Sequence, residues 1–98
     1  MNMQAIMQQA QKMQKDLQKK KDELNKKEFN GTSELVDVVF TGDKKLKSVN
    51  IKIEGTLDED DKDALQDMMV IAINNAMNKI DKEKDSILGA YGNLGGLF

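Results

Sequence analysis

Four lysines near the start of the chain can place a row of positive charges along one side of a helix. At 100° of rotation per residue, their side chains fall within about 60° of one another. Ammonium groups spaced along a rod can contact the phosphates of a nucleic-acid backbone. The four residues are Lys12, Lys15, Lys19 and Lys26. We treat them as the candidate DNA-binding residues.

A plain solvated helix face is the alternative interpretation of these lysines, and composition alone favours it. Asp16, Asp22 and Glu23 lie in the same segment and reduce its charge. The chain contains no arginine, the side chain that pairs with guanine through two hydrogen bonds and fits narrow minor grooves. Lysine acts as a point charge that suits phosphate. Any DNA binding is therefore expected to be directed at the backbone, with weak sequence preference.

The charge of the chain is distributed unevenly along its length. Residues 1–27 contain seven lysines and three acidic residues, which gives this segment a net charge of +4. Residues 55–98 contain four lysines and nine acidic residues, a net charge of −5, and the whole chain carries −2. The asymmetry indicates nucleic-acid contact at the basic end, whereas the acidic balance argues against strong binding.

The residue types that most catalytic and metal sites use are missing from the chain. It has no histidine and no cysteine, which removes the commonest general base, the thiol nucleophile and the usual zinc ligands. The acidic run at residues 58–61 lacks the ligand spacing and the glycine of a calcium loop, so we interpret it as the start of a helix. We predict no catalytic residue, no metal, no cofactor and no small-molecule substrate.

The lysine row requires a long amphipathic helix, which the spacing of apolar residues predicts over residues 2–27. The apolar positions recur at three- and four-residue steps on the side opposite the lysines. They are Met3, Ile6, Ala10, Met13, Leu17 and Leu24. Lys20 and Lys27 occupy further positions of the same stripe. We therefore expect its packing to loosen toward the C-terminal half of the helix.

Alternation between apolar and other residues predicts β-strands in the middle of the chain. Residues 34–41 form a strand with one strongly apolar face, and residues 48–54 form a second, half-buried strand. Residues 42–45 form the turn between them, so the two strands pair as a hairpin. Residues 29–33 are a candidate short strand before the hairpin. We expect a small antiparallel sheet of two to three strands.

A second long helix is predicted after the sheet. Thr56 and Glu59 have the spacing of a capping box, and acids in the first turn complement the positive end of the helix dipole. A broad apolar face follows at Leu65, Met68, Met69, Ala72, Ile73, Ala76, Met77, Ile80 and Ile87. The opposite side carries Asp63, Asp67, Asp81 and Asp85. A face this broad can cover a sheet and still meet a partner chain.

The pattern as a whole predicts one α+β domain that does not bury all of its apolar surface alone. We expect residues 1–88 to form this helix–sheet–helix domain and the glycine-rich residues 89–98 to form a flexible tail. The chain of 98 residues contains only three phenylalanines and one tyrosine, so its core is thin and aliphatic. The apolar stripes of two long helices exceed what such a core can cover, which predicts an obligate or near-obligate homodimer.

The sequence also predicts the compartment of the protein. No apolar run approaches the roughly 20 residues that cross a bilayer. The first residues are rich in glutamine and lack the continuous apolar core of a secretory signal. We therefore expect a cytoplasmic protein with no membrane partner.

A series of segments, in order along nearly the whole chain, carries a family resemblance. The segments are MQQAQKMQKDLQ at residues 7–18, VDVVFTG at 36–42, the strand at 49–53, LDEDDKDAL at 57–65 with Ala72, Asn75, Ala76 and Ile80 after it, and the glycine-rich end. Together they resemble the YbaB/EbfC family of bacterial nucleoid-associated proteins. The resemblance implies a helix–sheet–helix protomer, an intertwined homodimer with projecting helical arms, and association with DNA in the nucleoid.

Two classes of function follow from these patterns and from the resemblance. The first is a nucleoid-associated protein that binds double-stranded DNA as a homodimer, mainly through backbone phosphates. The second is a small dimeric scaffolding protein whose helical arms grip another protein and that does not bind DNA. Binding to phosphates must weaken steeply with salt, so a salt-dependent DNA-binding measurement separates the two classes.

Overall fold

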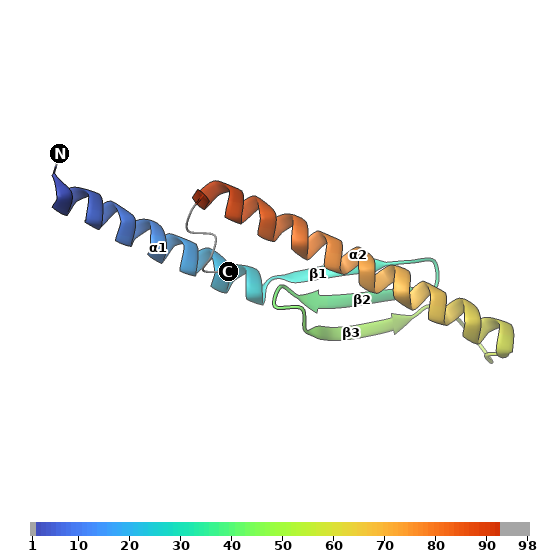
Figure 1. Ribbon diagram of the computed structural model, residues 1–98. Helices are drawn as coiled ribbons and strands as arrows, with labels where there is room; N and C mark the ends of the chain where they lie inside the picture. Colours follow the sequence, from blue (N-terminus) through green and yellow to red (C-terminus); the bar gives the residue numbers. More distant parts are fainter. Residues whose placement is uncertain (1, 93–98) are drawn as a thin grey trace.

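Two long helices flank a small sheet in the computed structural model, which describes residues 2–92 (Figure 1). The elements are α1 (Met3–Lys26), β1 (Glu28–Thr32), β2 (Val36–Thr41), β3 (Leu46–Ile51) and α2 (Glu59–Tyr91). The molecule is strongly elongated, measuring 71 × 17 × 14 Å along its principal axes. The predicted α+β architecture is confirmed, and the candidate strand before the hairpin is present as β1.

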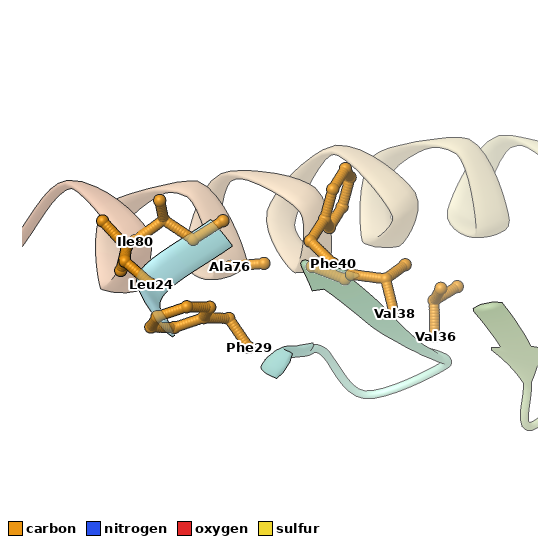
Figure 2. Packing of buried hydrophobic residues seen from close by; sticks show 8 residues of the cluster. Leu24, Phe29, Val36, Val38, Phe40, Ala76 and Ile80 are labelled. Carbon is orange, nitrogen blue, oxygen red and sulfur yellow. The ribbon is translucent and has the colours of Figure 1, made fainter. Parts of the chain in front are cut away.

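The three strands form an antiparallel sheet in the order β1-β2-β3. Val38 of β2 pairs with Gly31 of β1 on one side and with Val49 of β3 on the other. Residues that face each other across a pair of strands project from the same face of the sheet. Val36, Val38 and Phe40 therefore point together toward α2 (Figure 2). The strand begins at Val36 and not at residue 34, because the Ser33 amide donates to the Val36 carbonyl at 2.8 Å and closes a turn.

The hydrophobic core lies between α2 and the first two strands. Its buried members are Leu24, Phe29, Val36, Val38, Phe40, Ala72, Ala76 and Ile80. All nine apolar positions predicted on α2 are buried or packed against this cluster, so that face is confirmed. Ala72 and Ala76 are small enough for β1 to approach the backbone of α2 at Gly31, where a Cβ would lie 1.9 Å from the Ala72 carbonyl oxygen. The close approach makes the core dense although few aromatic residues contribute to it.

Both ends of α2 differ from the prediction. The N-cap is Asp58, whose carboxylate accepts from the Asp61 amide at 2.8 Å, while the Asp61 carboxylate accepts from the Asp58 amide at 3.1 Å. The predicted capping box of Thr56 and Glu59 is wrong because these reciprocal bonds between aspartates satisfy the helix start two residues later.

At its other end α2 continues to Tyr91, so part of the predicted tail is helical. A glycine inside a helix costs only about 1 kcal/mol, and Gly89 does not end this one. Residues 93–98, the remainder of the predicted tail, lie outside the described residues.

The prediction of a half-buried third strand is wrong for the single chain. Every residue of β3 is exposed, with Val49 at 41% and Ile51 at 45%. Both side chains lie on the sheet face that α2 covers, because they pair with Val38 and Val36. However, α2 packs on β1 and β2 and does not reach β3. The apolar face of β3 therefore remains uncovered within the protomer.

The apolar stripe of α1 is buried only in its C-terminal half, which is the reverse of the predicted loosening. Leu17 and Leu24 are buried, whereas Met3, Ile6 and Met13 are exposed. Within the protomer, the sheet and α2 lie against the end of α1, so burial follows the neighbouring elements and not the seam lysines (Figure 1).

Three contacts fix the C-terminal end of α1 to the rest of the fold. Leu24 packs in the core beside Phe29 and Ile80 (Figure 2). The Gly42 amide donates to the Lys27 carbonyl at 2.9 Å, and a Cβ at Gly42 would lie 1.7 Å from the Leu24 carbonyl oxygen. The Lys27 ammonium forms an ion pair with Glu83 of α2 at 2.8 Å and lies 5.4 Å from the centre of the Phe29 ring. The rest of α1 projects from this anchor as an arm.

Candidate nucleic-acid interface

The four predicted lysines lie on the solvent-exposed side of the α1 arm. Each of them is exposed, and they are Lys12, Lys15, Lys19 and Lys26. Lys15, Lys19 and Lys26 surround one shallow surface hollow, together with Gln18 and two acidic residues. Lys12 precedes this group by one turn on the same side of the helix. The row extends along about 21 Å of the helix axis at 1.5 Å per residue.

The ammonium groups of this row form no ion pair with the part of the chain that the structure describes. Within residues 2–92, none of the four lysines forms an ion pair. Lysines elsewhere have partners: Lys44 pairs with Asp81 at 3.1 Å, and the Lys79 ammonium donates to the Asn30 carbonyl at 2.7 Å. The row on α1 therefore keeps its positive charge available to a ligand.

The acidic residues of α1 are partly engaged with neighbours outside the row. Asp22 accepts a hydrogen bond from the Gln18 amide group at 3.1 Å. Glu23 lies 3.7 Å from the ammonium group of Lys20, which belongs to the apolar side of the helix. Both carboxylates also line the hollow that Lys15, Lys19 and Lys26 surround. Asp16, Asp22 and Glu23 still lower its net charge.

Positive and negative charge lie at opposite ends of the long axis. The arm that carries the lysine row projects from one end of the sheet, and the first turns of α2 project from the other (Figure 1). Residues 58–67 at the start of α2 hold six carboxylates and one lysine. At separations greater than a Debye length of about 8–10 Å, their repulsion of a polyanion at the arm is largely screened.

The turn between β2 and β3 contains a carboxyl group, that of Asp43, whose pKa departs from its ordinary value. The Thr41 hydroxyl donates a hydrogen bond to the Asp43 carboxylate, which lowers the pKa of Asp43, and the nearby Lys45 ammonium lowers it further. This arrangement belongs to the turn between the two strands and does not include any residue of the lysine row. It adds nothing to the candidate interface.

Comparison with known proteins identifies the family. The sequence model of the YbaB/EbfC DNA-binding family matches residues 1–95. The chain belongs to the YbaB/EbfC family. Its fold, its sequence resemblance and the family match therefore agree.

Several bacterial relatives of this YbaB/EbfC chain carry the description nucleoid-associated protein. One from Enterococcus faecalis is 48% identical over 92 residues, covering 92% of this chain and 88% of the relative. One from Ligilactobacillus salivarius is 47% identical over 100 residues, covering 99% and 95%. One from Streptococcus agalactiae is 47% identical over 93 residues, covering 93% of each chain. The similarity thus extends over essentially the full length of the domain.

The described part of this YbaB/EbfC chain offers no second candidate site of another chemical kind. Among residues 2–92, no three carboxylates gather closely enough to hold a metal ion. The acidic run at residues 58–61 instead contributes the N-cap of α2. Over the same residues, both helices fall short of the apolar length that a bilayer crossing requires.

The sequence-based search missed one surface that the fold exposes. Leu46, Val49 and Ile51 of β3 form an uncovered apolar strip beside α2. The alternation over residues 48–54, which includes Val49 and Ile51 but not Leu46, predicted a half-buried strand and did not indicate which element would bury its apolar face.

Proposed function

We propose that this chain is a nucleoid-associated protein of the cytoplasm that binds double-stranded DNA as a homodimer. The observation that carries the proposal is the row of four unpaired lysines on an exposed arm, in a chain of a DNA-binding family. The proposed role is binding without catalysis, and it needs no cofactor. The absence of histidine and cysteine from the sequence supports this part of the proposal.

The contacts are proposed to be mainly with backbone phosphates. Lysine presents a compact charge on a flexible stem, which reaches phosphate oxygens but does not distinguish bases as a planar guanidinium does. The chain has no arginine to read base edges in this way. Binding through the row is therefore expected to have weak sequence preference and to place the arm along the duplex.

The uncovered strip on β3 supports the proposed homodimer. Leu46, Val49 and Ile51 are between 41% and 50% exposed and continue the sheet face that forms the core. The Lys52 amide donates to the Leu35 carbonyl, so in this register the backbone groups of Val49 and Ile51 face the open edge of the sheet. A second copy placed against β3 would cover both the apolar strip and the open edge. Two copies would also present two lysine rows to one duplex.

A measurement of duplex DNA affinity as a function of salt tests the proposed DNA binding. Each phosphate neutralised by a lysine releases a counterion, so the affinity should fall with salt at a slope near −0.9 per contact. Fluorescence anisotropy with unrelated duplex sequences should give similar affinities at each salt concentration. If no binding occurs at about 50 mM salt, the proposal fails and the scaffolding role becomes the better hypothesis.

Val49→Asp is expected to shift the protein from dimer to monomer. The substitution places a carboxylate on the apolar strip. Forming the interface would remove water from this carboxylate, which costs free energy. We expect the dissociation constant of the dimer to rise by at least about tenfold, because even about 1.4 kcal/mol of lost interface energy has this effect. Sedimentation velocity over a range of concentrations measures the change.

Ser48→Asp is the matched control for this variant. Ser48 is the neighbouring residue of β3 and lies on the opposite, polar face of the sheet. The Ser48→Asp substitution should leave the dimer intact. Equal effects of the two variants, or a stable dimer of Val49→Asp, would argue against the strip as the interface.

A further inference from the structure

The tip of the α1 arm carries no charged side chain. Residues 2–11 contain no ionisable side chain and consist of methionine, isoleucine, alanine, glutamine and one asparagine. The lysine row begins only at Lys12. The side chains of the tip therefore offer no positive charge to neutralise a phosphate.

The tip nevertheless exposes large apolar side chains. Met3 is 68% exposed, Ile6 46%, Met7 59% and Met13 38%. At 100° per residue, these four and Ala10 fall within about 120° of helix surface, on the side away from the lysine row. Clustered apolar residues on an exposed helix face indicate a protein-interaction surface.

We infer that the arm tip is a second self-association surface, which packs against the arm tip of another copy of this chain. The absence of charged side chains favours a second copy as the occupant: two tips can approach without repulsion between side chains, and neither offers a pattern of charged side chains to select an oppositely charged partner. The stripe is also self-complementary. Ala10 is small enough for close approach of two helices, and the methionines adapt their shape to fill the gaps around it.

An antiparallel arrangement of the two tips fits the charges best. In a parallel pair, the two lysine rows would lie at the same level on opposite sides of the pair, so both positive segments would be gathered at one end. In an antiparallel pair centred near Ile6, the Ile6 positions of the two copies face each other, and the two lysine rows point away from each other along the shared axis. Such a pair is symmetric, with the same patch on both copies.

The tip surface and the strip on β3 occupy different parts of the molecule. The arm projects away from the sheet, so contact at the tip does not require β3 (Figure 1). Together with the proposed homodimer, a second surface would connect dimers into larger assemblies. The tip seam covers about 15 Å of helix, so a single contact is weak, and several linked contacts would strengthen one another.

Disulfide trapping can test this contact without DNA. The natural chain contains no cysteine, so a single introduced cysteine gives an unambiguous cross-link. Ile6→Cys places the thiol on the apolar stripe, and Gln4→Cys places it on the lysine side of the same turn. Under mild oxidation, the Ile6→Cys protein should form covalent pairs at least about tenfold faster, because the tip contact raises the effective concentration of the two thiols.

Two controls separate this inference from its alternatives. A small thiol reagent should modify both cysteines at similar rates, so that a difference in cross-linking reports proximity and not reactivity. The preference should persist between about 50 and 200 mM salt, where phosphate-dependent binding falls steeply. Equal cross-linking of the two variants would overturn the inference and would leave the proposed DNA binding untouched. Failure to bind DNA would likewise leave the tip contact standing.

Discussion

Changing Lys12, Lys15, Lys19 and Lys26 together to glutamine is expected to weaken duplex DNA binding on the order of a hundredfold at about 50 mM salt. With about four to six phosphate contacts per dimer, the parent protein should show a salt slope of about −3.6 to −5.4. Its affinity should then fall on the order of hundreds-fold to thousands-fold between about 50 and 200 mM salt. The variant should lose most of this slope. Glutamine has a helix propensity close to that of lysine, so α1 should remain helical.

A charge-matched variant distinguishes the row on α1 from net charge. Changing four lysines outside α1 to glutamine removes the same number of charges; the set is Lys45, Lys47, Lys62 and Lys82. Because these residues lie on β3, on its preceding turn and on α2, this variant should retain most of the affinity and the salt slope. A folded, dimeric α1 variant with unchanged affinity and slope would refute the assignment of the site. Circular dichroism and sedimentation establish folding and dimerisation for both variants.

Gly31→Ala is expected to lower the free energy of unfolding by about 3 kcal/mol. The added Cβ would lie 1.9 Å from the Ala72 carbonyl oxygen and 2.8 Å from the Ala76 Cβ. Both neighbours belong to the buried face of α2, and the carbonyl is a backbone atom that no side-chain rotation can move. β1 would have to separate from α2, which opens the core. Urea unfolding at a fixed protein concentration measures the loss, because the stability of the proposed dimer would depend on concentration.

Glycine to alanine at Gly89 should change the free energy of unfolding in the opposite direction. Gly89 lies in the last turns of α2, and a Cβ there would have no neighbour within 4 Å. Alanine favours the helix over glycine, so Gly89→Ala should raise stability by about 0.5 kcal/mol. A loss at Gly89 as large as the loss at Gly31 would contradict the packing argument. No change at Gly89 would instead favour the predicted boundary of the domain at residue 88.

The spacing of residues along the chain determined the elements and the faces of the helices. The steps of three and four residues in α1 placed the lysine row opposite the apolar stripe, and the nine apolar positions of α2 are those that pack in or against the core. These features depend only on helical periodicity, which is a local property of the chain. The lysine row could therefore be selected from the sequence alone, although its DNA contacts remain a prediction.

Helix ends were less predictable because several residues can satisfy the same backbone groups. Both Thr56–Glu59 and Asp58–Asp61 fit the capping-box pattern, and only the path of the chain into α2 selected the aspartates. Likewise, Gly89 fits either a tail or a helix. Its position in the helix follows from the continuation of α2 beyond Ile87, which packs against the core.

Only the tertiary structure determined which apolar residues are buried within a single chain. Periodicity assigns Val49 to an apolar face in the same way as Val38, and Ile6 in the same way as Leu24. α2 covers two strands of the sheet and α1 meets the core only at its end, so Val38 and Leu24 are buried while Val49 and Ile6 are exposed. Burial depends on the distance to other elements, which residue spacing within one element does not encode. For this reason the sequence predicted that apolar surface would be left over, and the fold located it on β3 and on the arm tip.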